Sequence, residues 1–229
     1  MRAIVPVLDH GFVRLVDHMG DDLSIVKSAR VSHNAVWRAG EDAGKDQKLI
    51  RYLMRNKHTS PFESVTFTFD IKAPIFVVRQ WHRHRTWSYN EVSARYTQLP
   101  EEFYIPSLDH VGSQSDVNKQ ARVIEEGKWN DQDEEFCEDL QIHSENGFRL
   151  YQEHLEQGIP RELARCFLGL NTYTQFFGTV NLHNLFHYLR LRLTGHAQWE
   201  IREYAIALLI LIDPVAPVAV AAFKEYLGE

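Results

Sequence analysis

The stretch SVTFTFDIKA, residues 64–73, decides the fold class, because its side chains alternate between apolar and polar. Polar residues fill the even positions from Thr66 to Lys72. Apolar residues fill the odd positions: Val65, Phe67, Phe69 and Ile71. A repeat of two is the period of a strand with one buried face. The stretch therefore predicts a half-buried β-strand.

The residues before this strand predict a strand, a turn and two helices. Alternation over 12–16 indicates a strand, and Gly20, Asp21 and Asp22 indicate a turn. The stretch LSIVKSARVS (23–32) then has a helical repeat with Asp at its start. The stretch DQKLIRYLMRNKH (46–58) predicts a second helix. It should stop before Thr59-Ser60-Pro61, because the residue ahead of a proline avoids the α region.

The residues after the strand predict a helix that leads into a cationic loop. Pro74 suits a first helical turn, so we expect IFVVRQWHRHR (75–85) to be helical. Gln80, Arg83 and His84 would then share one face, since residues three and four apart lie together. The chain would continue as a loop, TWSYNEVSARY (86–96).

The C-terminal half predicts mainly helices. An acidic run at 125–139 is typical of a solvated helix face. We expect helices at 160–170, 180–193 and 196–212, separated by residues 171–178 and by Gly195. Hairpins near the N-terminus and a helical C-terminal half predict a single α+β domain over 1–229, with an antiparallel or mixed sheet.

Composition excludes several classes of protein. The chain has 229 residues and 44% hydrophobic content, which suffices for a substantial core. Its net charge of −6 argues against broad nucleic-acid binding, which requires the neutralisation of many phosphates. Cys137 and Cys166 form no CxxC motif, so no disulfide framework or thiolate metal site is expected. The sequence has no apolar run of membrane-spanning length and no signal-peptide pattern, so we expect a cytoplasmic protein without membrane contact.

The stretch RHRTWSYNEVSARY (83–96) gathers three arginines and a histidine beside aromatic and short polar side chains. Arginine donates paired hydrogen bonds to phosphate and planar carbonyl groups, and aromatic rings offer stacking surface. The mixture fits a nucleotide. A surface loop whose arginines pair with the acids of 125–139 would explain the same composition, and both interpretations stay open here.

Other chemical motifs are weak or missing. His183 and His187 have the spacing of helical zinc ligands, but no glutamate completes HExxH, so polar, ligand-facing histidines are favoured and no metal is expected. His84 lies between two guanidinium groups, which disfavours its protonated form and suits it to an aromatic cofactor. Ser93 lacks a GxSxG context for a nucleophile, and neither GxGxxG nor a P-loop occurs.

The sequence resembles the flavin-dependent thymidylate synthases. RHRTWSYNEVSARY fills every specified position of that family's signature RHRxxSxNExSxR. Similar stretches are GFVRLVDHMGDDLSIVKSARVS (11–32), HTSPFE (58–63), APIFVVRQW (73–81), PRELAR (160–165) and LRLRLTGHAQWEIR (189–202). Only about 107–150 lies outside the resemblance.

The resemblance implies a homotetramer of α+β subunits, each binding FAD, with active sites where subunits meet. Such enzymes convert dUMP to dTMP with a methylene group from 5,10-methylenetetrahydrofolate and hydride from flavin that NADPH has reduced. Arg192 would be the catalytic residue, because a guanidinium at the pyrimidine N3 edge favours the deprotonated ring and enriches C5 in electron density. No enzyme nucleophile is implied.

The resemblance also implies two sets of binding residues. The dUMP set is Gln80, Trp81, His82, Arg83, Glu91, Val92, Ser93, Ala94, Arg95, Arg165 and Arg192. The FAD set is Ser32, His58, Ser60, Arg83, His84, Arg85, Glu91, Asn181, Leu182, His183 and His187. Arg83 to Arg85 would reach the flavin of a neighbouring subunit, and His183 and His187 stand where some members have arginine and asparagine.

Two hypotheses of other classes compete with this one. A nucleic-acid-binding module would use the arginine loop, with Trp87 and Tyr89 as stacking platforms. A metal-dependent nucleotide hydrolase would use His183 and His187 as ligands. Neither hypothesis explains why the other stretches also resemble the flavin-dependent thymidylate synthases.

Overall fold

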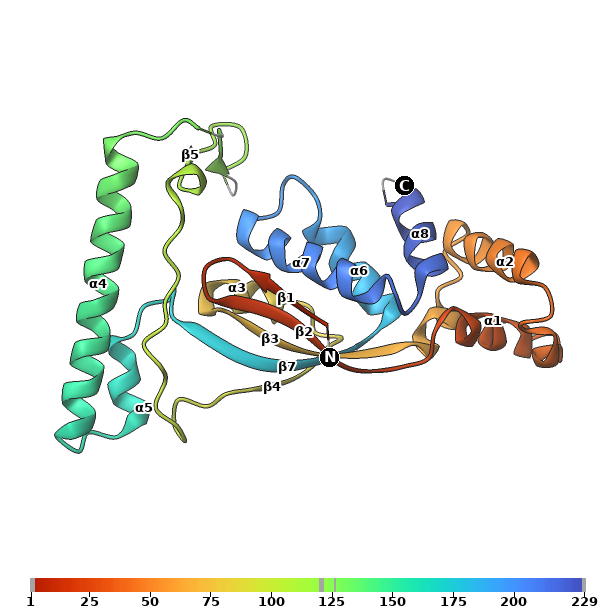
Figure 1. Ribbon diagram of the computed structural model, residues 1–229, viewed down its shortest axis with the longest axis horizontal. Helices are drawn as coiled ribbons and strands as arrows, with labels where there is room; N and C mark the ends of the chain where they lie inside the picture. Colours follow the sequence, from red (N-terminus) through yellow and green to blue (C-terminus); the bar gives the residue numbers. More distant parts are fainter. Residues whose placement is uncertain (1–2, 120–121, 126, 228–229) are drawn as a thin grey trace.

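The computed structural model describes residues 3–119, 122–125 and 127–227 and is built around a five-stranded sheet (Figure 1). In order across the sheet the strands are β1 (Ile4–Val7), β2 (Gly11–Met19), β3 (Thr66–Pro74), β7 (Tyr173–Asn181) and β4 (Ser88–Glu91). All neighbouring pairs are antiparallel. The strand predicted at 64–73 is β3, the middle strand, and the predicted N-terminal hairpin is β1–β2.

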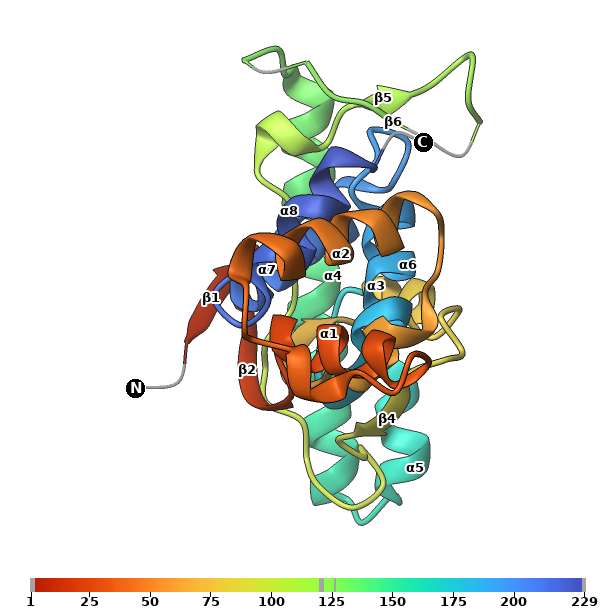
Figure 2. The ribbon, with the colours of Figure 1, turned by 90° about the vertical axis from the view of Figure 1, so that its right-hand side faces the viewer.

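Helices cover one face of the sheet and extend beyond both of its ends (Figure 1). Over the face lie α3 (Ile75–Trp81), α6 (Leu182–Arg192) and α7 (Trp199–Ile212). At one end lie α1 (Asp22–Val31), α2 (Ala43–Arg55) and α8 (Pro217–Glu225), and at the other α4 (Asp131–Glu156) and α5 (Arg161–Ala164). Figure 2 shows the short strands β5 (Ser113–Gln114) and β6 (Arg122–Val123) near one end of α4, with α5 near the other. Four 3₁₀ turns complete the described elements: Val36–Arg38, Ser60–Ser64, Leu108–His110 and Arg165–Phe167.

The core forms because the apolar face of β3 meets these helices. Phe67, Phe69 and Ile71 are fully buried, as are Trp81 of α3 and Tyr204 of α7. The polar face of the same strand is filled differently: buried Asp70 pairs with Arg14 and accepts a hydrogen bond from Gln175 Nε2 at 2.7 Å. The α+β class and the antiparallel sheet predicted from the sequence are confirmed.

The helix predicted over 75–85 is too long, since α3 ends at Trp81. The next residues turn, and His84 and Trp87 fold back into the core with only 7% and 5% of their surface exposed. The Tyr89 hydroxyl then donates to the carbonyls of Trp81 and His84 at 3.0 and 2.9 Å. Both carbonyls also accept hydrogen bonds from backbone amides of the turn, those of His84 and Trp87, so Tyr89 adds a side-chain bond that holds the turn after α3. The prediction that Gln80, Arg83 and His84 share a helical face is therefore wrong.

Residues 171–178, predicted as a spacer between helices, belong largely to strand β7, which pairs with both β3 and β4. Gly178 interrupts the apolar pattern for a packing reason: a Cβ there would lie 3.1 Å from the Trp87 ring. The prediction at 86–96 is also wrong in part, because β4 forms within that segment to pair with β7. Close packing of an indole on the strand hides the strand signal.

The remaining helix predictions differ mainly in their ends. Within 160–170 only α5 and one 3₁₀ turn form, and the first helix of the C-terminal series is instead α6, which Asn181 caps. Helix α7 begins at Trp199 and stops before Asp213-Pro214 as predicted. The acidic run is mostly exposed from Asp131 to Asp139, in the first turns of α4, while Glu126 lies outside the described residues.

Candidate active site

A buried histidine and an arginine form the centre of the candidate site. His84 lies in the turn after α3, and Arg192 lies in the last turn of α6. Arg192 Nε donates to His84 Nε2 at 3.1 Å, and its Nη2 donates to the Gln80 carbonyl at 3.4 Å. Because Nε2 accepts, the imidazole must be neutral. The pair fixes the direction of the guanidinium.

The electrostatics of the pocket agree with a neutral His84. Burial lowers its pKa to about 4, and the positive charge of Arg192 and the nearby His187 add to the effect. The sequence suggested that Arg83 and Arg85 would depress this pKa. The direction is confirmed, but the cause is different, since burial and a residue 108 positions away in the chain produce it.

One group of predicted residues surrounds a cavity of about 400 Å³ at the β4 edge of the sheet. Its lining includes Glu91, Val92, Ser93, Ala94 and Arg165, together with Thr174 of β7. The Thr174 hydroxyl donates to Glu91 Oε1 at 2.6 Å, which holds that carboxylate against the sheet. His82 Nε2 lies 3.9 Å from Glu91 Oε2. The structure thus brings most of the predicted dUMP loop together.

Arg165, which lines this cavity, and Arg95, which follows the lining residue Ala94, share one acidic neighbour. Arg95 Nε lies 3.1 Å from Glu162 Oε2, and Arg165 Nε donates to the Glu162 carbonyl at 3.3 Å. The acid that Arg95 meets is therefore Glu162, and the suggested pairing of Arg95 with residues 125–139 is wrong. More than half of each side chain in the Arg95–Glu162 pair is exposed, so the pair is weak and a doubly charged anion can compete for the guanidinium.

A second group of predicted residues lies at the far end of β7. His183 and His187 of α6 line a cavity of about 200 Å³ with Met54, Lys57, Thr59, Phe62, Phe186 and Arg190. Asn181 caps α6 by accepting from the Asn184 amide at 2.9 Å. His58 and Ser60 lie on either side of Thr59, and Ser32 ends α1, which packs on the Ser60–Ser64 turn.

Two predicted contact residues are buried. Trp81 stacks on Tyr188 with ring centroids 4.9 Å apart, and neither Trp81 nor Leu182 has exposed surface. Neither residue therefore offers surface to a ligand within one chain. Trp87 is nearly as buried, and both the Tyr89 hydroxyl and the Trp87 ring are engaged internally. The stacking platforms that the nucleic-acid hypothesis required are thus not available.

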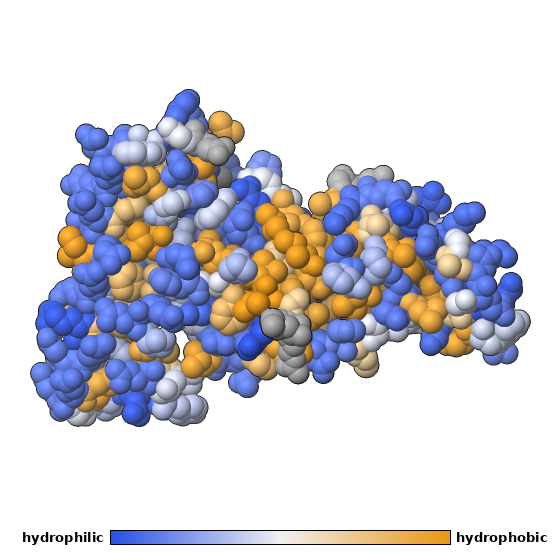
Figure 3. All heavy atoms as spheres, viewed as in Figure 1, coloured by the Kyte–Doolittle hydropathy of each residue, from blue (hydrophilic) through white to orange (hydrophobic). Residues whose placement is uncertain are grey.

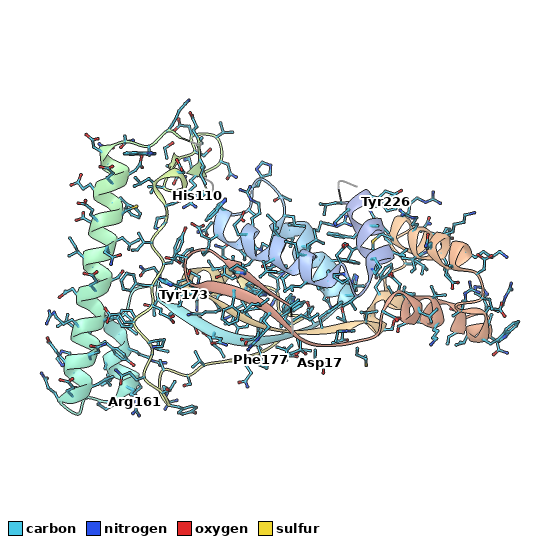
Figure 4. All side chains as sticks on the ribbon, viewed as in Figure 1. Asp17, His110, Arg161, Tyr173, Phe177 and Tyr226 are labelled. Carbon is cyan, nitrogen blue, oxygen red and sulfur yellow. The ribbon has the colours of Figure 1, made fainter. Side chains whose placement is uncertain are left out.

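The two groups lie apart within one chain. Thr174, at the first cavity, is seven residues from Asn181, at the second, or roughly 23 Å along an extended strand. Figure 4 shows Tyr173 toward the α4 end of the sheet and Phe177 between the two ends of the strand. His84 lies next to the second group, since its ring centroid is 6.2 Å from that of His187, while Arg83 and Arg85 are exposed in the turn.

Metal binding by the histidines lacks a third ligand in the part of the chain that the structure describes. In those residues no group of three or more His, Cys, Asp or Glu side chains is placed to hold a metal ion. No described helix is long and apolar enough to cross a membrane.

Glu162, Thr174 and Gln198 are neighbours of the site that sequence reasoning did not identify. Glu162 and Gln198 lie inside the stretches PRELAR and HAQWE, so the resemblance contained a signal for them. Thr174 gave none, because its strand was not predicted.

Comparison with known proteins assigns the family. The profile described as "Thymidylate synthase complementing protein" matches residues 14–218. A flavin-dependent thymidylate synthase of Thermus thermophilus is 51% identical over 225 residues, which is 98% of this chain and 80% of the relative. One of Thermotoga neapolitana is 47% identical over 222 residues, covering 97% and 94% of the two chains. The chain therefore belongs to the thymidylate synthase complementing protein family, and the resemblance found in the sequence is confirmed.

Solved structures support the same assignment. The UMP/dUMP methylase PolB from Streptomyces cacaoi, bound with 5-Br dUMP, superposes with a TM-score of 0.85 at 37% identity. The match covers 97% of this chain and 98% of PolB. The same enzyme bound with 5-Br UMP gives a TM-score of 0.84.

Proposed function

We propose that this chain is an enzyme that methylates dUMP to dTMP, with a flavin as its redox cofactor. The observation that carries this proposal is the hydrogen-bonded His84–Arg192 pair, in a chain with relatives named flavin-dependent thymidylate synthase. The residues at the first cavity would bind the nucleotide, and the second polar group, which contains His187 beside His84, would bind the flavin cofactor. The proposed reaction needs both.

The first cavity would bind the nucleotide. Arg95, Arg165 and Ser93 would take the phosphate, because two guanidinium groups can replace the exposed Glu162 contact with a doubly charged partner. The other proposed contacts are Gln80, His82, Arg83, Glu91, Val92 and Ala94. Trp81 would act from the core, between Gln80 and His82 in the chain, because it has no exposed surface. We also propose that residues 1–229 form a single domain.

Arg192 is the proposed catalytic residue. Since neutral His84 accepts from its Nε, the guanidinium keeps Nη groups for the N3 edge of the pyrimidine. Positive charge there favours the ring anion and increases electron density at C5, where the new bond forms. Cys137 is unsuited to a nucleophilic role: burial raises the pKa of its thiol, and the thiol donates to the Pro106 carbonyl at 3.4 Å.

The second cavity would hold part of an FAD. His183, His187, Arg190 and Lys57 supply donors suited to an anionic diphosphate, and Phe62 and Phe186 supply apolar surface. Ser32, His58, Ser60, His84, Arg85, Asn181 and Leu182 complete the proposed set, with Arg83 and Glu91 between the sites. When bound, the reduced flavin supplies the hydride. NADPH and 5,10-methylenetetrahydrofolate are the proposed co-substrates.

A homotetramer is part of the proposal, because one chain holds the two groups of residues apart. Apolar side chains gather on the surface over α7 and the N-terminal hairpin (Figure 3). Exposed Ile4, Ile206 and Ile210 belong to these contacting elements. Such a patch is typical of a subunit interface. We place the enzyme in the cytoplasm, acting on small molecules and not on nucleic acid.

An anaerobic absorbance experiment tests the function. Purified protein is mixed with FAD, then with NADPH, first without and then with dUMP. We expect the flavin band to bleach, and dTMP to form once methylenetetrahydrofolate is added. Protein that retains no flavin and leaves the spectrum unchanged with NADPH would contradict the proposal.

A further inference from the structure

Glu200, the second residue of α7, has no part in the function proposed above, yet it is a carboxylate with only 1% of its surface exposed. Three donors converge on it. The Tyr104 hydroxyl and Arg122 Nη2 reach Oε1 at 3.2 and 2.7 Å, and Gln198 Nε2 reaches Oε2 at 2.9 Å. A buried carboxylate is tolerated when it is paired and fully hydrogen-bonded. Glu200 is therefore a fixed acceptor.

Gln198 links Glu200 to the candidate site, because Glu200 fixes the orientation of the Gln198 side-chain amide. A carboxylate can only accept hydrogen bonds, so the amide nitrogen of Gln198 must face Glu200. The amide oxygen of Gln198 then faces the other way, where it accepts from Gln80 Nε2. Glu200 thereby determines which end of the Gln198 amide meets Gln80.

Gln80 is the last step of this relay, which we define as Glu200, Gln198 and Gln80. Because its Nε2 donates to Gln198, its Oε1 is the end left to accept a hydrogen bond from a ligand. Its backbone carbonyl accepts from Arg192 Nη2 at 3.4 Å, so the same residue contacts the proposed catalytic arginine. The relay thus joins the buried N-terminal turn of α7 to the proposed nucleotide site.

The donors to the second carboxylate oxygen of Glu200, Oε1, come from the segment after β4 and from β6. That segment supplies Tyr104 and runs along α4 on the side that faces the sheet (Figure 1), and β6 supplies Arg122. His110 of this segment stacks on Trp199, with ring centroids 3.7 Å apart and planes at 20°. These contacts enclose Oε1, so Glu200 cannot turn its carboxylate away from Gln198.

We propose that Glu200 is a positioning residue that, through Gln198, makes Gln80 present an acceptor oxygen to the bound nucleotide. This inference rests on the proposed function, since it takes dUMP as the molecule that Gln80 meets. Neither Glu200 nor Gln198 touches the nucleotide in this arrangement. They raise the affinity for dUMP by fixing the orientation of the Gln80 side-chain amide.

The variant Glu200→Gln tests the direction of the relay. Its amide oxygen would face the donors Arg122 and Tyr104, so its nitrogen would face Gln198. Gln198 must then turn, and Gln80 with it, so that Gln80 presents a donor to the ligand. We expect the Kd for dUMP, measured by calorimetry, to rise about tenfold or more, because one polar group of the site is then mismatched. Flavin content should not change.

The exchange variant, Gln198→Glu together with Glu200→Gln, reverses only the hydrogen bond between residues 198 and 200 and keeps the bonds at both ends of the relay in their original direction. Residue 200 again accepts from Arg122, and residue 198 again accepts from Gln80. We expect wild-type dUMP affinity to return. If the exchange variant folds but binds as weakly as Glu200→Gln, or if Glu200→Gln binds as well as wild type, the proposal is wrong.

Further variants separate positioning from general stability. Glu203→Gln, a neighbour on α7 outside the relay, is the matched control and should leave the Kd unchanged. In a Gln80→Ala background, Glu200→Gln should cause no additional loss of affinity, whereas a purely structural effect would persist. If Glu200→Gln alone does not fold, the exchange variant decides: wild-type dUMP affinity supports the relay, and weak binding by folded protein overturns it.

Failure of the proposed function would look different. In that case wild-type protein itself would not bind dUMP. The relay takes dUMP as its ligand, so it would then be overturned together with the function. Failure of the relay alone leaves dUMP binding by wild-type protein intact and is visible only as unchanged affinity in Glu200→Gln or as unrestored affinity in the exchange variant.

Discussion

At the scale of single residues, the catalytic argument depends on Arg192. We expect Arg192→Ala to lower dTMP formation about a hundredfold or more, because the charge that stabilises the pyrimidine anion is removed. NADPH should still reduce the bound flavin, since the second cavity is intact. Single-turnover assays of dTMP and of flavin bleaching measure the two steps separately. Arg149→Ala on α4, an exposed pair with Glu153, is the control. Loss of both steps together would argue against a role limited to the pyrimidine.

Ser93 distinguishes binding from nucleophilic catalysis. Its Oγ accepts from the Arg95 amide at 3.3 Å, and the residue lines the nucleotide cavity, whose lining contains no histidine among the described residues. We expect Ser93→Ala to raise the KM for dUMP several-fold while turnover at saturation persists. A variant that binds dUMP normally but makes no dTMP would revive the nucleophile interpretation.

His84 gives the protein a pH-dependent stability. Its pKa is about 4 in the folded state and near 6.5 when unfolded, so the unfolded chain binds the extra proton first. This residue's contribution to the free energy of unfolding is therefore complete above pH 6.5 and falls as the pH drops toward 4. Urea titrations from about pH 7 to about pH 4 should show a shallower decline for His84→Gln, whose Oε1 can still accept from Arg192. Parallel declines would show that His84 does not titrate in this window.

The sequence could predict which residues gather at a cavity, but it could not predict which side chains they contact. The arginine signature pointed to residues that line one cavity, because guanidinium and hydroxyl groups are the donors that a phosphate needs. The partners Glu162 of Arg95 and Arg192 of His84 lie 67 and 108 positions away in the chain. Such pairs arise only when β4, α5 and α6 meet in the fold.

At the scale of elements, strands with strict alternation could be predicted and closely packed ones could not. β3 was found because nothing interrupts its repeat of two. β7 was missed because Gly178 reads as a loop signal, although it is the position where Trp87 packs on the strand. The end of α3 was misplaced for a related reason: burial of His84 and Trp87 outweighs the helical propensity of 82–85.

Gly178→Ala tests that explanation. The new Cβ would lie 3.1 and 3.2 Å from two Trp87 ring atoms and 3.4 Å from Phe176, so the indole must shift. We expect the free energy of unfolding to fall by about 1–3 kcal/mol, as for other overpacked cores. Gly195→Ala, where a Cβ meets nothing within 4 Å, is the matched control. Equal stability of the two variants would show that Trp87 does not require a glycine.

At the scale of the whole molecule, the shape of one chain raises the question of where a complete site forms. The nucleotide residues lie at the β4 edge and the α4 end of the sheet, while the second cavity lies by α6 near α1 and α2. The sequence does not reveal that the two groups of residues are separated in space, because both belong to stretches that match the same family. An assembly in which one subunit's nucleotide group meets another's flavin group would join them.

Complementation between inactive variants tests this arrangement. One variant, Arg95→Ala with Arg165→Ala, lacks the nucleotide group; the other, His183→Ala with His187→Ala, lacks the flavin group. Each alone should be inactive. In mixed assemblies, a site that takes its nucleotide group from one subunit and its flavin group from another is intact in about a quarter of random pairings. Co-expressed variants should therefore recover about a quarter of wild-type dTMP formation. If both groups served a site within the same subunit, every site would carry a defect, and the mixture would remain inactive.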